Sequence, residues 1–199
     1  MSMVGIQSVL SDEMQRRCAE VHGQILPEEG LLLAELAAKV PSEQIIVEIG
    51  AYKGKSSCYL AAGAKAGGGA LVYAVDLWDR APWPEYADPE VCIAWAANVG
   101  NLGLVGRVVA VQADTEVAAR EIDGEVGLLF VDSDHSYEGV CRDIGAWAPR
   151  VTPDGVMAFH DANTEHWGVA KAIRDRLLAT ARYTYQIKHG LAILRRRPP

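Results

Sequence analysis

The sequence predicts an α/β fold with a doubly wound, mostly parallel seven-stranded sheet, helices on both faces and a C-terminal antiparallel strand. Five short apolar runs have the length of buried parallel strands; they span 45–49, 71–76, 107–112, 126–132 and 155–160. Helix-length segments follow these runs, at about 55–66, 88–99, 114–121, 137–148 and 167–180. The tail YTYQIKHGLAILRR adds two strands around a turn at His189 and Gly190.

Two further helices precede this pattern, at about 11–22 and 28–39, and Pro41 ends the second. We therefore expect one domain in which residues 1–40 form N-terminal helices and residues 41–199 form the ligand-binding part. Leu32, Leu33 and Leu36 have helical spacing, so this face could cover a site, form a dimer seam or pack on the sheet.

The composition limits the protein class. Hydrophobic residues make up 50% and charged residues 23% of the 199 residues, which is typical of a globular protein. The net charge of −7 disfavours a nucleic-acid surface. No apolar run approaches the roughly 20 residues that span a bilayer, and the N-terminus lacks a secretory signal pattern. The four cysteines lie far apart without a CxxC spacing, so we expect reduced thiols in a cytoplasmic protein.

Polar residues follow each of the five predicted parallel strands. They are Glu48, Asp76, Asp114, Asp132 and the pair His160–Asp161. Ligands of open α/β sheets bind at the carboxyl ends of the strands, where these side chains would meet. The sequence therefore predicts a binding site at this edge of the sheet.

The loop after the first strand, EIGAYKGKSS, resembles a phosphate-binding P-loop but is one residue short. Three residues separate Gly50 from Gly54, where a P-loop has four. Glu48 would repel a triphosphate and attract a cationic ligand. Asp76 lies 22 residues beyond Gly54, where doubly wound folds carry the acid that accepts hydrogen bonds from ribose hydroxyls. An adenosyl sulfonium compound fits these features better than a nucleoside triphosphate.

These motifs, with QADTEVA, LLFVDSDHSYEGVCRDI and PDGVMAFHDA, resemble those of class I S-adenosylmethionine-dependent methyltransferases, which have a Rossmann-like fold. The resemblance extends from about residue 40 to 195. It is strongest to small metal-dependent O-methyltransferases that act on sugars of bacterial antibiotics and glycans. The resemblance implies that 41–199 is a catalytic domain whose cofactor-binding residues are Glu48, Gly50, Tyr52, Gly54, Ser56, Ser57, Asp76, Leu77, Trp78, Asp114, Thr115 and Asp132.

Within this set the resemblance implies particular contacts. Glu48, Gly50 and Gly54 would surround the methionine part of the cofactor, and Asp76 would bind its ribose. Asp114 and Thr115 would lie near the adenine, on which Trp78 would pack. Ser56 and Ser57 would approach the methionine carboxylate at the N-terminus of a helix.

Asp132 and Asp161 end neighbouring strands and lie 29 residues apart, so they can converge on one ion, Mg²⁺ or Mn²⁺. Catechol-type methyltransferases are similar here, but they follow the second aspartate with an asparagine ligand where this chain has Ala162. The third ligand is therefore open between His160, Asp134, Asn163 and water. Two other roles for His160 are equally open. It could hydrogen-bond to the metal ligands without binding the ion, or it could simply be buried at the end of the strand.

His135, three residues after Asp132, occupies the position of the lysine base in catechol-type enzymes. Imidazole suits proton removal near pH 7, so we expect His135, Asp132 and Asp161 to form the catalytic set. The alternative is a histidine that only hydrogen-bonds the loop. Asp134 either contacts the acceptor or caps the helix that starts near Ser136.

The segment LWDRAPWPEYADPE is a proline-stiffened aromatic loop beside the predicted ribose site. Trp83 and Tyr86, with Trp167 and Asp134, are candidates for binding the acceptor, because aromatic planes stack on sugars and phenols alike. The alternative is that the aromatic residues only pack the loop onto the domain or onto a second subunit.

The predicted function is methyl transfer to a hydroxyl of a small acceptor, with a carbohydrate favoured over a catechol or other phenol and a homodimer expected. Two other functional classes remain as alternatives to a methyltransferase. An NAD-dependent oxidoreductase is disfavoured because GxGxxG and Tyr-x-x-x-Lys are missing. An adenosyl-compound sensor would not need the Asp132, His135 and Asp161 set.

Overall fold

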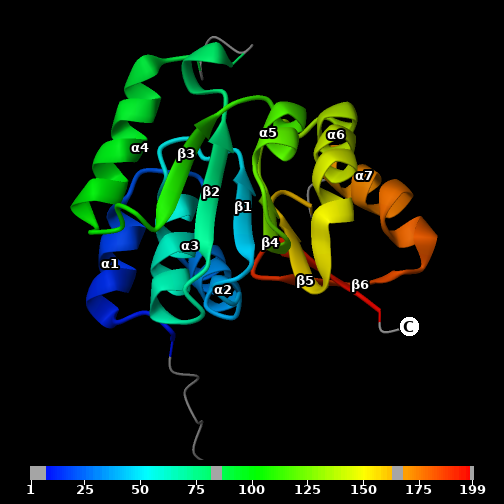
Figure 1. Cartoon of the computed structure of the whole chain (residues 1–199), viewed down its shortest axis with the longest axis horizontal. Helices are drawn as coiled ribbons and strands as arrows, with labels where there is room; N and C mark the ends of the chain where they lie inside the picture. Colours follow the sequence, from blue (N-terminus) through cyan, green and yellow to red (C-terminus); the bar gives the residue numbers. More distant parts are fainter. Residues whose placement is uncertain (1–7, 82–86, 163–167, 198–199) are drawn as a thin grey trace, which may run out of the picture.

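A seven-stranded sheet forms the centre of the protein, with strand order β3-β2-β1-β4-β5-β7-β6 (Figure 1). This computed structural model describes residues 8–81, 87–162 and 168–197. The strands are β1 Ile45–Ile49, β2 Leu71–Asp76, β3 Val108–Gln112, β4 Val126–Val131, β5 Val151–Phe159, β6 Tyr183–Lys188 and β7 Leu191–Arg196. Strands β1 to β5 pair in parallel, whereas β7 is antiparallel to both β5 and β6. The predicted fold class is therefore confirmed.

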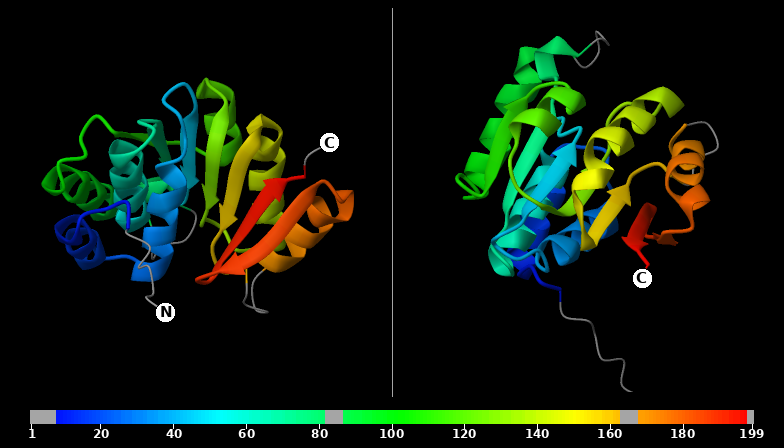
Figure 2. Two further views of the ribbon diagram at one scale, coloured as in Figure 1. Left: turned by 90° about the horizontal axis from the view of Figure 1, so that it is seen from below. Right: turned by 45° about the vertical axis from the view of Figure 1, so that its right-hand side comes forward.

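Helices cover both faces of the sheet (Figure 2). They are α1 Asp12–Glu20, α2 Pro27–Ala37, α3 Lys55–Ala66, α4 Pro89–Asn101, α5 Thr115–Glu121, α6 Tyr137–Trp147 and α7 Val169–Arg176, with short 3₁₀ turns at Trp78–Arg80, Ala148–Arg150 and Leu178–Thr180. Four of the α-helices begin at a side chain that accepts a backbone N–H hydrogen bond: Ser11, Asp88, Asp114 and Ser136. Local capping chemistry thus fixes where these helices start.

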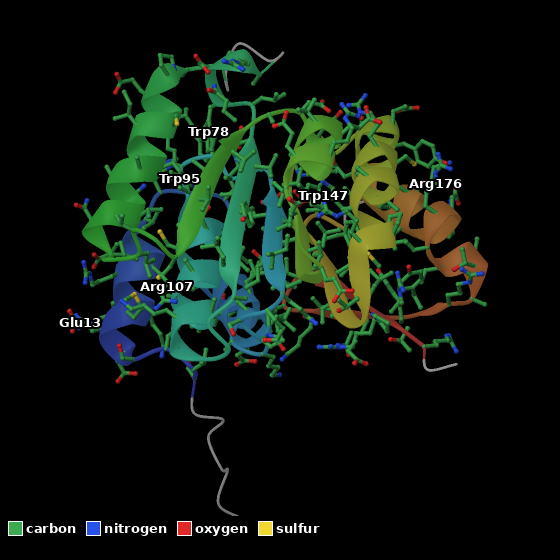
Figure 3. All side chains as sticks on the ribbon, in the orientation of Figure 1. Glu13, Trp78, Trp95, Arg107, Trp147 and Arg176 are labelled. Carbon is green, nitrogen blue, oxygen red and sulfur yellow. The ribbon has the colours of Figure 1, made fainter. Side chains whose placement is uncertain are left out.

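Two apolar cores lie on opposite sides of the sheet. Helices α1 to α4 enclose one, which contains Trp78 and Trp95, and α5 to α7 enclose the other, which contains Trp147 (Figure 3). Three leucines of α2, Leu32, Leu33 and Leu36, are buried within the chain, with Leu33 0% exposed. None of the described helices has the length and apolar character that crossing a membrane requires.

Strand β5 begins at Val151, although the sequence pattern predicts a start at 155. The segment Thr152-Pro153-Asp154 resembles a turn in sequence. Its pairing with β4 changes register between Val126 and Leu128, and such a bulge lets a strand tolerate proline.

Candidate active site

A cavity of about 680 Å³ lies at the carboxyl ends of the parallel strands. Its walls come from the ends of β1 and β2 and from the segments that lead into α5 and α6. The α1–α2 connection supplies a further wall through Gly23, Gln24 and Ile25, which the sequence pattern did not single out. The predicted site residues that line the cavity are Gly50, Tyr52, Ser56, Asp76, Leu77, Asp114, Thr115, Asp132, Asp134 and His135. Most of the predicted set thus meets in one place, as the strand topology requires.

Asp76 holds the first loop in shape. Its Oδ2 accepts hydrogen bonds from the backbone N–H groups of Ala51 and Tyr52, each at 2.8 Å, and its Oδ1 accepts one from Trp78 N at 2.8 Å. A carboxylate offers about four lone-pair sites, so three bonds leave capacity for a ribose hydroxyl. The acid predicted to bind ribose therefore also organises the loop around the cavity.

Trp78 lies behind the loop rather than on the cavity wall. It is 1% exposed, its indole N–H donates to the carbonyl of Tyr52 at 3.0 Å, and its ring meets Trp95 edge-on. Gly54 is also outside the cavity lining; it has φ +87° and starts α3. The expected packing of Trp78 on an adenine is not what the structure has, because its ring is buried in the core that α1 to α4 enclose.

Glu48 also lies behind the loop. It is 0% exposed, and Ser57 donates its hydroxyl hydrogen bond to Oε2 while accepting one from Trp95 Nε1 at 2.9 Å. Oε1 has no hydrogen-bond partner among the described residues. Burial raises the pKa of Glu48 to about 8, and the hydrogen bonds from Ser56 and Ser57 only partly oppose this. Glu48 is therefore mainly neutral at pH 7 and does not line the cavity as the charge that the sequence suggested.

This burial predicts a pH-dependent stability. The folded protein keeps a proton on Glu48 that the unfolded chain releases above about pH 4.5, so the contribution of Glu48 is fully present below that pH and is lost as the pH rises through about 8. Glu48→Gln is expected to remove this dependence and to be more stable than the wild type at pH 9. Urea unfolding at pH 5, 7 and 9 tests this, with exposed Glu28→Gln as the control. Parallel pH profiles for Glu48→Gln and the wild type would contradict it.

The other end of the cavity lies against α5 and α6. Asp114 caps α5, accepting from Glu116 N at 2.9 Å, and the Thr115 hydroxyl accepts from Trp147 Nε1 at 3.0 Å. Asp143 lines the cavity here, although the sequence pattern did not identify it. Its Oδ2 accepts from Ser133 Oγ at 2.7 Å, and burial raises its pKa to about 6. Its only sequence signal was an aspartate within the helix predicted at about 137–148.

Four donor atoms form a closed ring beside the cavity. His135 Nε2 lies 3.3 Å from Asp132 Oδ1 and 3.1 Å from Asp161 Oδ2. His160 Nδ1 lies 3.2 Å and 3.1 Å from the same two oxygens. The four residues are the group of described side chains whose ligand atoms all lie within 4.8 Å of one another. The predicted catalytic set and the predicted metal ligands are thus one cluster.

The backbone and charges of this cluster are unusual. Asp161 has φ +53°, a left-handed conformation that aspartate adopts more readily than most residues. Burial opposes a charged His160 ring, but the carboxylates of Asp132 and Glu29 outweigh it and raise its pKa to about 11. Burial likewise opposes charge on Asp132, yet hydrogen bonds from His135 and His160 hold its pKa below the ordinary value. The cluster thus concentrates negative charge beside the two imidazole rings.

The spacing of the ring fits a divalent cation. An octahedral ion with bonds of about 2.2 Å places neighbouring ligands about 3.1 Å apart, close to the four distances above. The two carboxylate oxygens are donors that suit Mg²⁺ and Mn²⁺, and the two imidazole nitrogens are donors that suit transition-metal ions.

Asp134 turns away from the cluster. It accepts from Ser136 N at 2.9 Å and lies 3.5 Å from Arg142, while Ser136 itself is the N-cap of α6. Asp134 therefore fixes the turn before α6, although it still borders the cavity. The acceptor candidates Trp83, Tyr86 and Trp167, and the ligand candidate Asn163, lie outside the described residues.

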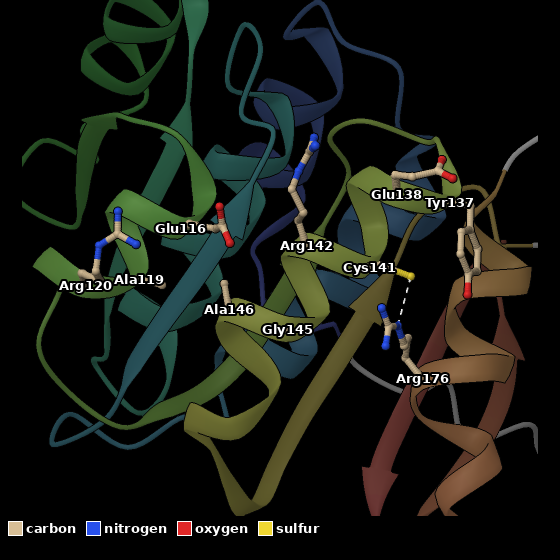
Figure 4. Close-up of a pocket in the computed structure, with 10 residues that line it drawn as sticks. All are labelled: Glu116, Ala119, Arg120, Tyr137, Glu138, Cys141, Arg142, Gly145, Ala146 and Arg176. Carbon is tan, nitrogen blue, oxygen red and sulfur yellow. Dashed lines mark hydrogen bonds between the residues drawn. The ribbon is translucent and has the colours of Figure 1, made fainter.

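A second hollow of about 580 Å³ opens on the outer surface between α5, α6 and α7 (Figure 4). Arg120, Arg142 and Arg176 border it together with Glu116 and Glu138. Arg176 Nε donates to Cys141 Sγ at 3.3 Å. None of the predicted site residues lines this hollow, so the strand-end cavity is the candidate active site.

Comparisons with known proteins agree with this geometry. Residues 47–162, more than half of the chain, match the family described as "Methyltransferase domain". The chain is also 29% identical over 158 residues to the uncharacterized protein y4gI of Sinorhizobium fredii; the match covers 75% of this chain and 17% of y4gI. The chain therefore spans a small part of the length of that curated relative.

Solved structures share the whole fold. The SAH-bound methyltransferase PaMTH1 of Podospora anserina has a TM-score of 0.68 at 16% identity, covering 95% of this chain and 89% of that one. CalS11, a TDP-rhamnose 3'-O-methyltransferase of calicheamicin biosynthesis, has a TM-score of 0.61 at 19% identity, covering 92% of this chain and 93% of its own. The strand-end cavity, the family match and these shared folds lead to one assignment: this chain belongs to the methyltransferase domain family and has the class I S-adenosylmethionine-dependent methyltransferase fold.

Proposed function

We propose that this protein is an S-adenosylmethionine-dependent and divalent-metal-dependent O-methyltransferase whose acceptor is a sugar or glycoside hydroxyl. The observation that carries the proposal is the ring of Asp132, His135, His160 and Asp161 beside a cavity of about 680 Å³. The cavity size is in the range of small-molecule and cofactor sites. Asp132 and His135 belong both to the ring and to the cavity lining, so a donor and an acceptor could meet there.

In this proposal the cavity holds the cofactor in an extended pose. Asp76 binds the ribose, Asp114 and Thr115 border the adenine, and Gly50 and Ser56 border the methionine part. Asp143 adds a buried carboxylate at the adenine end, 3% exposed. These residues supply positioning, which is the main protein contribution to an in-line displacement at a methyl group.

At the other end, Asp132, Asp161 and His160 would hold Mg²⁺ or Mn²⁺, for which the two carboxylates are suitable ligands. The bound cation would stabilise negative charge on the acceptor oxygen. His135 would accept the proton of the acceptor hydroxyl, as the general base. Asp132 orients that ring, because its Oδ1 lies 3.3 Å from Nε2.

A carbohydrate acceptor is supported by the resemblance of the sequence motifs to sugar O-methyltransferases and by the shared fold of CalS11, whose name gives TDP-rhamnose as its substrate. Trp83, Tyr86 and Trp167 are proposed to stack on the acceptor, and Asp134 to border it. A phenolic acceptor of the catechol type is the alternative within the same chemistry. The homodimer and the cytoplasmic location also stay predictions.

The test of this proposal combines measurements of cofactor binding with assays of methyl transfer. Calorimetry is expected to detect S-adenosylhomocysteine binding and no binding of NAD or ATP. A panel of nucleotide sugars, glycosides and phenols is then assayed for methyl transfer, and EDTA is expected to lower the rate at least 100-fold, with recovery on adding Mn²⁺ or Mg²⁺. NAD binding would favour an oxidoreductase, and cofactor binding without transfer to any acceptor would favour a sensor. A rate that EDTA leaves unchanged would remove the metal but not methyl transfer.

A further inference from the structure

Glu29 reaches the metal-ligand cluster from the N-terminal helices. It lies in the first turn of α2, and it is 4% exposed. Its Oε2 lies 3.3 Å from His160 Nε2, a contact between residues 131 positions apart in the chain. The same oxygen accepts a hydrogen bond from Leu26 N at 2.6 Å. A carboxylate that would ordinarily be an exposed helix cap is therefore buried against the site.

The two nitrogens of His160 face different partners. Nε2 faces Glu29, whereas Nδ1 faces Asp132 Oδ1 and Asp161 Oδ2 at 3.2 Å and 3.1 Å. When Nε2–H donates to a carboxylate, the lone pair of a neutral ring is on Nδ1 and its direction is fixed. Metal-binding histidines are commonly held in this way by an acid or carbonyl behind them.

We propose that Glu29 is a positioning residue that holds His160 with Nδ1 directed at Asp132 and Asp161, so that helix α2 completes the divalent-cation site. The inference rests on the cation site of the proposed function. It gives the N-terminal helices a defined role in the site, beyond covering the sheet.

Packing around Glu29 restricts its carboxylate. The Oε1 atom lies against Gly190, in the turn between β6 and β7, where a β-carbon would overlap it. Gly190 has φ +90°, so the turn and the close approach both suit glycine. At the next position, a β-carbon on Gly30 would overlap the ring of Tyr59 in α3, so α2 sits close against α3. The carboxylate is thus confined between the His160 ring and the C-terminal hairpin.

The alternative is that Glu29 serves only as the cap of α2. Glu29→Gln separates the two roles, because the amide oxygen can still accept from Leu26 N but is a weaker acceptor for His160 Nε2–H than the charged carboxylate. Glu28→Gln is the matched control: it makes the same change one residue earlier, on an exposed side chain of the same helix turn.

The experiment measures the dissociation constant of Mn²⁺ by electron paramagnetic resonance for the full chain. Glu29→Gln is expected to weaken Mn²⁺ binding by about 10- to 100-fold, the usual effect of removing the partner of a metal-binding histidine. Glu28→Gln is expected to bind as the wild type does. S-adenosylhomocysteine affinity is expected to stay unchanged in both variants. A merely structural role of Glu29 would not weaken Mn²⁺ binding while leaving S-adenosylhomocysteine binding intact.

A double-mutant cycle with His160→Asn tests whether Glu29 acts through the ring. In the His160→Asn background, Glu29→Gln is expected to cause no further loss of Mn²⁺ affinity. An equal loss in both backgrounds would mean that Glu29 acts by charge alone and would overturn the inference. Unchanged affinity of Glu29→Gln would overturn it and leave the cation site standing, whereas a wild type that does not bind Mn²⁺ would overturn both.

Discussion

Replacing His135 with asparagine is expected to lower kcat for methyl transfer by about 10²- to 10⁴-fold, the range attributed to a general base. The reason is geometric: His135 borders the cavity, and its Nε2 is held by Asp132 and Asp161. Asparagine keeps a polar side chain but cannot accept a proton near neutral pH. Steady-state rates with the best acceptor of the panel measure the effect.

The pH profile adds a second readout for the same variant. A base works only when deprotonated, so the wild-type rate is expected to rise with pH as the ring loses its proton. Without a bound cation, the hydrogen bond to Asp132 raises the pKa of His135 above its ordinary value. A cation held by Asp132 and Asp161 would oppose this shift of the pKa. The asparagine variant is expected to lack that rise.

Binding measurements on the same variant decide whether His135 is the general base or a metal ligand. As a base, His135 can be replaced without a large change in S-adenosylhomocysteine or Mn²⁺ affinity. A large loss of Mn²⁺ affinity would instead make His135 a fourth ligand, which the ring of distances also permits. Near-wild-type turnover in a variant that binds the cofactor would remove the assignment altogether.

The sheet and the position of the site could be predicted from sequence because parallel strands place their carboxyl ends at one edge. Asp76, Asp132 and Asp161 follow such strands, and the structure brings Asp132 and Asp161 onto the same histidine nitrogens. The closeness of His135 and His160 follows from the same rule, because His160 comes directly after β5 and His135 lies in the loop after β4.

Side-chain direction was harder to predict than position. Glu48 shares strand parity with Ile46, whose side chain is part of the core under α1 to α4, so alternation along β1 directs Glu48 to that side. Applying this alternation would have identified Glu48 as a buried acid. Glu29 had no such signal, because an acid in the first turn after Pro27 is what an ordinary helix start contains. Its contact with His160 depends on tertiary packing alone.

Gly50→Ala is the backbone change with the largest expected effect. Gly50 has φ +89°, and a β-carbon there would lie 2.6 Å from the carbonyl carbon of Asp132 and 2.9 Å from Ser133 Cα. The loop cannot easily withdraw, because Gly50 N donates to Val75 O at 2.9 Å and Asp132 N donates to Ile49 O at 2.8 Å. A left-handed alanine and an overlap with backbone together are expected to lower the free energy of unfolding by about 3 kcal/mol.

The same overlap displaces Asp132, so Gly50→Ala is also expected to weaken S-adenosylhomocysteine binding by at least about 100-fold, which corresponds to roughly 3 kcal/mol. Urea unfolding and calorimetry measure the two effects. Gly100→Ala is the matched control: a β-carbon there meets nothing within 4 Å, and the helical site should gain about 0.5–1 kcal/mol. If Gly50→Ala has the wild-type free energy of unfolding and the wild-type affinity for S-adenosylhomocysteine, the close contact between the first loop and Asp132 is not required. If only binding is lost, the contact serves the cofactor site rather than the stability of the sheet.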